Sequence, residues 1–322
     1  MINTLRISRF KSIRELSLDC KRFNIFIGEP NTGKSNILES LGLFSWLPYS
    51  RGYSSRDFLR FERPGNLFYD EILDEPLEIQ CDTLSLKLEY EGGQFKGHCS
   101  DGDRVFVSFE GDHNEVRNVA GLTTNLAHFK YYRFSVKENF ARNESQYLLP
   151  PTGDNLVSLL LARRELRSVV NQPFLDRGLR LNLRPQEGKI EVVKQVDDVI
   201  ISYPYSLTSE TLQRLTFHIS AILSNQDSVL VFEEPESHSF PYHTKYLAEQ
   251  IALDENSNQY FIATHNPYFL LPLLEKSSTD EVAVFIVYYE DYETKVKELS
   301  VEALTELAEI DIFSNLERYL EV

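Results

Sequence analysis

An eight-residue stretch near the N-terminus has the residue types and spacing of a phosphate-binding loop. It reads Gly28-Glu29-Pro30-Asn31-Thr32-Gly33-Lys34-Ser35, which matches the Walker A pattern G-x-x-x-x-G-K-[ST]. In such a loop, backbone N–H groups and the start of the following helix surround a phosphate, Lys34 bridges the β- and γ-phosphates, and Ser35 binds Mg²⁺. Asn36, the next residue, is also a nucleotide-binding candidate. The stretch predicts a site for ATP and Mg²⁺.

The segments on either side of this loop have the pattern that it requires. The apolar run 23–27 (FNIFI) predicts a buried strand that ends at Gly28. Apolar residues then recur at helical spacing over 37–47, and Pro48 closes the segment. We therefore expect the order strand, glycine loop, helix.

Two carboxylates follow a second buried strand. Residues 229–232 (VLVF) predict a strand of a parallel sheet, and Glu233 and Glu234 come directly after it. In a parallel sheet this end lies beside the phosphate loop. We expect Glu233 to bind Mg²⁺ and Glu234 to orient or deprotonate the attacking water. Two acids after a strand also fit a solvated turn, but the neighbouring loop favours the catalytic interpretation.

A histidine ends a third strand of the same kind. Residues 260–263 (YFIA) predict a buried strand, and Thr264 and His265 follow. His265 would then lie at the same edge of the sheet, within reach of the γ-phosphate or the attacking water. A single histidine is more often structural, and the two neighbouring motifs favour a role in the reaction. Lys34, Glu234 and His265 are the catalytic candidates.

The rest of the chain predicts smaller elements around one α/β core. Alternating apolar residues over 76–110 fit an antiparallel meander, helical spacing follows over 154–172, and 190–200 reads as β-structure. The last twenty residues predict a helix. We expect a single domain over 1–322, divided as follows: a core formed by 1–48 and 225–322, a meander over 75–135, and a helical lobe over 153–224.

Composition excludes several classes of protein. There are 33 Lys plus Arg against 49 Asp plus Glu, and the resulting charge of −16 repels nucleic-acid phosphates at long range. Only three cysteines occur, with no close pair, so neither a disulfide framework nor a zinc site is predicted. No apolar run approaches the roughly 20 residues needed to cross a bilayer, and no signal segment is present. We expect a cytoplasmic protein.

Four segments together carry a resemblance to a known family. Residues 5–41 (LRISRFKSIRELSLDCKRFNIFIGEPNTGKSNILESL) resemble the opening of ABC-type AAA ATPases related to the OLD, RecF and SMC heads. Residues 232–241 (FEEPESHSFP) and 263–267 (ATHNP) resemble the OLD-like Walker B and histidine segments, and 150–156 (PPTGDNL) a segment before the helical lobe. The resemblance implies a P-loop NTPase head with a mixed central sheet, and a homodimer in which two heads sandwich two ATP molecules.

In the family, a signature segment of one head contacts the γ-phosphate bound to the other. Residues 205–214 (YSLTSETLQR) stand where that segment is expected, so the resemblance assigns Thr208 and Ser209 as its hydroxyl donors. Glu210 stands at the family's usual glycine, and Glu233 at its usual aspartate. Pro30 and Asn31 replace a common asparagine and glycine. These departures leave slow hydrolysis, or ATP sensing with little turnover, as open alternatives.

Further positions are carried over from the family more loosely. Lys11 and Ser12 correspond to positions near the nucleotide's base and sugar, although an exposed lysine in a turn is often only solvated. His238 either couples Glu234 to the opposite head or has a local structural role. Gln80 and Gln94 are candidates for the family's Q-loop glutamine by position alone.

The leading hypothesis is an ATPase whose ATP-driven dimerisation controls a separate partner, such as a nuclease or toxin in antiviral defence or genome maintenance. OLD proteins add a Toprim nuclease, but residues 266–322 are too few for one. A RecF-like DNA-binding ATPase is the alternative. Six arginines of the helical lobe favour it: Arg163, Arg164, Arg167, Arg177, Arg180 and Arg184. A monomeric P-loop kinase or GTPase is the lesser alternative.

Overall fold

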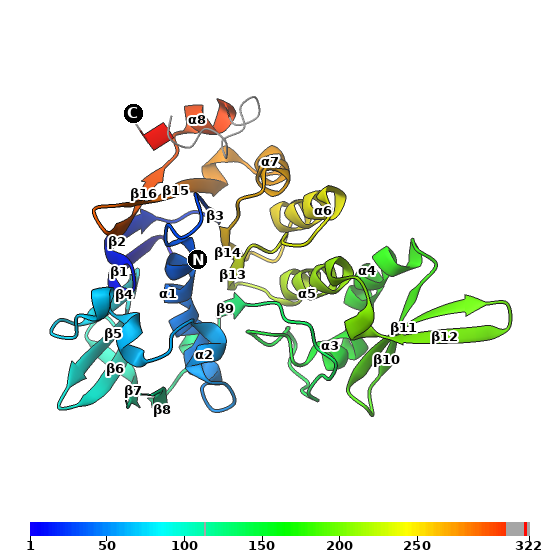
Figure 1. Cartoon of the computed structure of the whole chain (residues 1–322), viewed down its shortest axis with the longest axis horizontal. Coiled ribbons are helices and arrows are strands. Elements are labelled where there is room, and N and C mark those ends of the chain that lie inside the picture. Colours follow the sequence, from blue (N-terminus) through cyan, green and yellow to red (C-terminus); the bar gives the residue numbers. More distant parts are fainter. Residues whose placement is uncertain (113, 307–318, 321–322) are drawn as a thin grey trace.

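A six-stranded sheet forms the centre of the molecule (Figure 1). The computed structural model describes residues 1–112, 114–306 and 319–320. The sheet has the order β16-β15-β3-β14-β13-β9, and only β16 runs antiparallel to its neighbour. Its strands are β3 (Phe23–Ile27), β9 (Phe129–Tyr132), β13 (Val229–Glu233), β14 (Gln259–Ala263), β15 (Val282–Glu290) and β16 (Glu293–Glu298). The inner strands are apolar almost throughout because layers cover both of their faces.

A second, antiparallel sheet covers one face of the central sheet, with helix α1 (Lys34–Trp46) packed between them. Its seven strands follow the order β2-β1-β4-β5-β6-β7-β8. They are β1 (Thr4–Phe10), β2 (Ile13–Asp19), β4 (Leu77–Cys81), β5 (Leu84–Glu91), β6 (Gln94–Asp101), β7 (Arg104–Gly111) and β8 (Val116–Gly121). Ile37, Leu41 and Phe44 of α1 are fully buried in this layer. Helix α1 is therefore enclosed by apolar residues on both sides.

Helices cover the opposite face of the central sheet (Figure 1). They are α3 (Leu156–Ala162), α4 (Arg164–Leu175), α5 (Glu210–Ser224), α6 (Pro241–Ala252) and α7 (Pro267–Lys276). Alternate residues of β13 point to the two layers: Leu230 packs with the helices and Val231 with α1. A three-stranded sheet extends beyond the helices and consists of β10 (Arg180–Arg184), β11 (Lys189–Val196) and β12 (Val199–Pro204). The short helices are α2 (Ser55–Phe58) and α8 (Val301–Glu306).

The expected α/β class is confirmed, while two sequence-based boundaries change. Strand β9 falls in the segment 75–135 predicted as meander, yet it pairs in parallel with β13 in the central sheet. All four residues of β9 (FKYY) are buried, as expected of a strand covered on both faces. A meander strand with one face in solvent would have exposed side chains. The helical segment 154–172 is divided into α3 and α4 at the extended residue Arg163. Helix α8 begins where a C-terminal helix was predicted, and 307–318 and 321–322 lie outside the described residues.

Within the residues that the structure describes, no helix combines the length and the apolar character needed to span a membrane.

We predict that Leu41→Ala lowers the free energy of unfolding by about 2–5 kcal/mol, because it leaves a cavity where α1 is enclosed between two sheets. Urea unfolding followed by circular dichroism measures the change. Leu253→Ala is the matched control, since Leu253 is 58% exposed and its truncation removes little packing. Equal losses in the two variants would contradict the described position of α1.

Candidate nucleotide-binding site

The phosphate loop leaves β3 and enters α1 through two glycines that no other residue can replace without strain. Gly28 has φ 148° and Gly33 has φ 104°, a region that L-residues rarely adopt. A Cβ on Gly28 would lie 2.1 Å from the carbonyl oxygen of Val287, and one on Gly33 would lie 2.0 Å from Oγ1 of Thr294. The loop therefore packs directly against β15 and β16 at these two glycines. Glu29, Pro30 and Asn31 form its exposed tip.

The side chain of Lys34 folds back over this loop. Its Nζ donates hydrogen bonds to the carbonyl oxygens of Gly28, at 2.7 Å, and Glu29, at 2.6 Å. Thr32 stabilises the same turn by donating its hydroxyl to the Glu29 carbonyl at 2.9 Å. Burial lowers the pKa of Lys34, and the nearby carboxylates of Glu234, Glu233 and Glu29 oppose that shift. The ammonium group thus lies among the carboxylates predicted to take part in the reaction.

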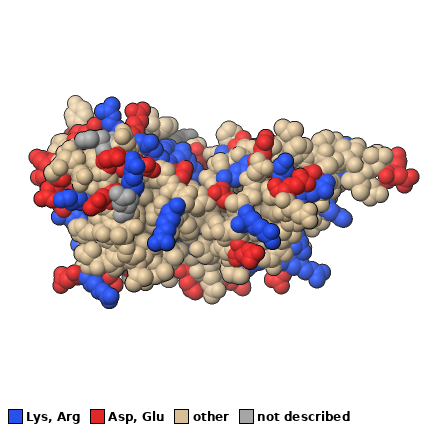
Figure 2. Space-filling model, turned by 90° about the horizontal axis from the view of Figure 1, so that it is seen from below, with Lys and Arg blue, Asp and Glu red and all other residues tan. Residues whose placement is uncertain are grey.

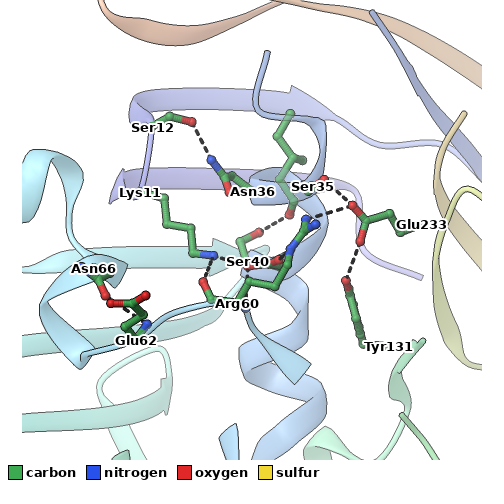
Figure 3. Close-up of polar contacts among 12 residues, drawn as sticks. Lys11, Ser12, Ser35, Asn36, Ser40, Arg60, Glu62, Asn66, Tyr131 and Glu233 are labelled. Atoms are coloured by element: carbon green, nitrogen blue, oxygen red, sulfur yellow. Dashed lines mark hydrogen bonds and ion pairs between the residues drawn. The ribbon is translucent and has the colours of Figure 1, made fainter. Parts of the chain in front are cut away.

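Glu233 connects the end of β13 to the phosphate loop (Figure 3). The hydroxyl of Ser35 donates to its Oε1, and Arg60 Nη2 donates to the same oxygen at 2.9 Å. The hydroxyl of Tyr131 donates to Oε2 at 3.3 Å. The two residues predicted to bind Mg²⁺ from distant parts of the sequence are therefore in direct contact.

The chemistry of Ser35 and Glu233 suits Mg²⁺. Both present oxygen donors, which this hard cation prefers, and Mg²⁺ usually takes one or two protein ligands plus phosphate and water. A metal cage made of protein alone is not found among the described residues, since no three His, Cys, Asp or Glu side chains cluster suitably there. The pair fits an ion shared with a bound nucleotide.

Glu234 and His265 form a second contact at the same edge of the sheet. Oε1 of Glu234 lies 3.2 Å from Nδ1 of His265, and Ser237 donates its hydroxyl to the other carboxylate oxygen at 3.1 Å. Glu234 has φ 44°, and its N–H donates to the carbonyl of Ala263 at 2.9 Å. Both side chains are partly exposed, His265 at 59% and Glu234 at 38%. The pair can accept a proton from a water molecule that reaches it from solvent.

A third carboxylate of the same segment is buried. Glu236 is 3% exposed, its Oε1 accepts a hydrogen bond from the Thr264 hydroxyl, and its Oε2 is buried with no hydrogen-bond partner among the residues that the structure describes. Burial raises the pKa of Glu236 to about 7, while the Thr264 hydrogen bond opposes that shift and the charge of Glu234 adds to it. Sequence reasoning missed Glu236 as a separate group, although it lies within the Walker B segment.

Lys11 and Ser12, predicted near the base and sugar, are tied into the protein. Lys11 Nζ donates to the buried carboxylate of Glu39 and, at 2.7 Å, to the carbonyl of Arg60, so the side chain is not the solvated lysine of an open turn. Ser12 Oγ accepts from Asn36 Nδ2 at 2.7 Å (Figure 3). Ser12 therefore links the turn between β1 and β2 to the start of α1. Asn36 points towards this turn.

Thr208 and Ser209, the predicted signature residues, lie just before α5. Among the described contacts, neither residue touches the phosphate loop of its own chain. Ser209 is the residue before the helix, and the Thr208 hydroxyl donates to the carbonyl of Tyr205 at 2.7 Å. Glu210 forms an ion pair with Arg214 at 2.8 Å along the helix. Because Arg214 compensates the Glu210 charge, the helix start is less negative than the sequence alone indicates.

Arg60 and Tyr131 are site residues that the sequence did not reveal. Arg60 bridges Glu233 and the buried carboxylate of Glu39, with Nε 2.6 Å from Glu39 Oε1. The partners are 21 and 173 residues away from Arg60 in sequence. No local pattern of residue types could have identified contacts over that separation.

The arginines of the helical lobe are partly used inside the protein. Arg167 donates to the Leu160 carbonyl at 2.9 Å, Arg177 lies 2.9 Å from His243, and Arg184 pairs with Glu191 at 3.0 Å. Figure 2 shows basic side chains as separate groups interspersed with acidic ones on the face it displays. On this face the basic side chains do not form the continuous stripe expected of a nucleic-acid interface (Figure 2).

The candidate glutamines lie in the seven-stranded sheet, Gln80 in β4 and Gln94 at the start of β6. Gln80 donates to the carbonyl of Asp82 at 3.1 Å.

The carbonyl of His238 accepts a hydrogen bond from the Thr211 hydroxyl at 2.8 Å, so the segment after β13 is attached to α5.

Comparison with known proteins identifies the fold. No protein-family model and no curated protein sequence matches this chain. Two similar solved structures are the SmcHead bound to the C-winged helix domain of ScpA and the Smc head domain with an extended coiled coil bound to the C-terminal domain of ScpA, derived from Pyrococcus furiosus. They match with TM-scores of 0.56 and 0.52, identities of 15% and 13%, and coverage of 94% and 96% of this chain and 98% of each structure.

The chain has the fold of an SMC head domain. This fold, with its mixed central sheet, agrees with the expected head architecture, while the ABC-type ATPase activity and the finer OLD likeness stay predictions. Residues 156–204 form α3, α4 and a short three-stranded sheet.

We predict that Glu236→Gln becomes more stable relative to the wild type as pH rises from 5 to 8. In the folded protein the pKa of Glu236 is raised from 4.5 to about 7. Between pH 4.5 and about 7 the folded state therefore binds more protons than the unfolded state, and the wild type loses stability as pH rises through this range. The free energy of unfolding that the wild type loses in this way is about 3 kcal/mol. Glutamine cannot ionise, so the variant does not lose it. Urea unfolding of both proteins at the two pH values measures it. An identical stability difference at both would contradict the burial of this carboxyl group.

Proposed function

We propose that this chain is an ABC-type ATPase that binds ATP with Mg²⁺, hydrolyses it, and dimerises around it. The observation that carries the proposal is the meeting of three sequence motifs at one sheet edge: Ser35 contacts Glu233, and Glu234 contacts His265, 3.2 Å away. The fold shared with two solved SMC head domains supports it. The likeness in fold alone does not assign an activity.

Each site residue then has a role that its position suits. Lys34, now bonded to the loop's own carbonyls, would exchange these acceptors for the β- and γ-phosphate oxygens. Ser35 and Glu233 would hold Mg²⁺, which when bound neutralises charge on the phosphates. Arg60 and Tyr131 fix the Glu233 carboxylate against Ser35.

The attacking water would be activated by Glu234. Its carboxylate has one oxygen near His265 and the other held by Ser237, which fixes its direction. Glu234 accepts the proton of the water as that water attacks the γ-phosphorus and the bond from this phosphorus to the leaving ADP oxygen breaks, and His265 can donate a hydrogen bond to the developing charge. The exposed position of both groups lets water enter the site.

A second copy of the chain would complete the site. The start of α5 offers backbone N–H groups and the Ser209 hydroxyl to a phosphate from outside, and the Thr208 hydroxyl would exchange the Tyr205 carbonyl for that phosphate. Residues 205–214 are a signature-like segment, and in the family it contacts the nucleotide of the opposite head. Glu210 and the longer acid Glu233 make slow turnover the expected regime.

We further propose that ATP-driven dimerisation controls a separate effector protein, a nuclease or a toxin in antiviral defence or genome maintenance. The OLD-like segments 232–241 and 263–267 support this setting. Two solved SMC heads are bound to domains of ScpA, which shows that a head of this fold can present a surface to a separate protein.

We predict that Glu234→Gln forms an ATP-dependent dimer while phosphate release falls by about 100-fold, because binding is kept and the base is lost. Light scattering with and without ATP and Mg²⁺ gives the mass, and a phosphate assay gives turnover. Glu255→Gln, which makes the same change at an exposed acid after α6, is the matched control. A mass that never responds to ATP in any of these proteins would contradict the sandwich model.

A further inference from the structure

The buried carboxyl group of Glu236 is not explained by the hydrolysis scheme above. It contacts neither the phosphate loop nor the Mg²⁺ candidates in any described interaction, yet it lies two residues after the proposed base. Burying a carboxyl with one oxygen unpartnered is costly. An apolar side chain of similar volume would often leave a protein equally or more stable at such a position. A buried polar group that lowers stability in this way is expected mainly at functional sites.

The contact that Glu236 does make reaches the next strand of the sheet. It accepts the hydroxyl hydrogen of Thr264, the residue immediately before His265. Thr264 is held at two further points: its N–H donates to the carbonyl of Phe26 at 3.0 Å, and its Oγ1 accepts from the N–H of Asn266 at 3.1 Å. Since the Asn266 N–H already uses the hydroxyl as an acceptor, Glu236 receives the one hydrogen that the hydroxyl can donate.

This hydrogen bond joins the two turns that carry the reacting pair. Glu234 and Glu236 belong to the turn after β13, while Thr264 and His265 belong to the turn after β14. The direct Glu234–His265 contact is 3.2 Å long, and both groups are partly exposed, so that contact is weak by itself. The buried bond between Glu236 and Thr264 lies out of solvent and can fix the spacing of the two turns.

We propose that Glu236 is a positioning residue: through Thr264 it holds the turn that carries His265 beside the base Glu234. The proposal rests on the proposed function, because it concerns the same hydrolysis step. It assigns no contact with the nucleotide to Glu236. The effect is therefore on turnover and not on ATP binding.

Four variants test the proposal, with hydrolysis measured over a range of ATP concentrations. Glu236→Leu and Thr264→Val each remove one side of the hydrogen bond, and we expect kcat to fall about tenfold or more while KM stays within about twofold. Glu236→Gln keeps an acceptor oxygen and Thr264→Ser keeps the hydroxyl, so both are expected to stay within about threefold of wild-type kcat. Thr244→Val is the matched control, because Thr244 is a fully buried threonine of α6 whose hydroxyl has no hydrogen-bond partner within the described part of the chain.

The outcomes separate this proposal from the function on which it rests. If the wild type hydrolyses ATP but Thr264→Val has the same kcat as Thr244→Val, Glu236 does not position the pair, and the proposed function stands. Equal losses in Glu236→Gln and Glu236→Leu would also overturn it, since the acceptor oxygen would then not matter. If the wild type neither dimerises with ATP nor hydrolyses it, the proposed function is contradicted and the positioning role with it.

Discussion

The hydrogen bond between Ser35 and Glu233 is the interaction on which the rest of the site depends. It joins residues separated by 198 positions in sequence, and it forms because the central sheet brings the carboxyl ends of its parallel strands to one edge. The strand order β3-β14-β13 also places the turn that carries His265 between the phosphate loop and the two glutamates. A different strand order would separate the same residues, whatever their types.

Charge around this bond is balanced over a small region. Glu39, Glu233 and Glu234 lie near Lys11, Lys34 and Arg60, and several of these groups are buried or half-buried. Removing the buried carboxylate of Glu39 would leave the largely buried Lys11 ammonium without its charge partner, which is destabilising by about 3–5 kcal/mol. The site therefore constrains stability as well as chemistry. The protein's negative charge elsewhere does not affect the network strongly, because exposed charges are screened by salt beyond about 10 Å.

The sequence predicted structure best where an apolar strand or helix pattern stands directly beside residues of a known motif. The strand, loop and helix around residues 23–47 and the strand ends at Glu233 and His265 are present in the structure as predicted. The OLD-like specifics, the partner and the roles of individual site residues stay predictions. Strand β9 was assigned to the wrong sheet, since a four-residue strand carries no signal for which sheet it joins. Arg60, Tyr131 and Thr294 could not be predicted because their contacts depend on the assembled fold.

The most direct test of the account is calorimetric ATP binding to the wild type and to Lys34→Ala, each with Mg²⁺. Lys34 Nζ is held at the phosphate loop by two hydrogen bonds, and its loss removes charge-assisted bonds to the nucleotide. The account predicts that the wild type binds ATP and that Lys34→Ala binds at least about tenfold more weakly, while Lys245→Ala, a change at a half-exposed lysine of α6, binds like the wild type. Equal affinity in the wild type and Lys34→Ala, or no binding to the wild type, would contradict it.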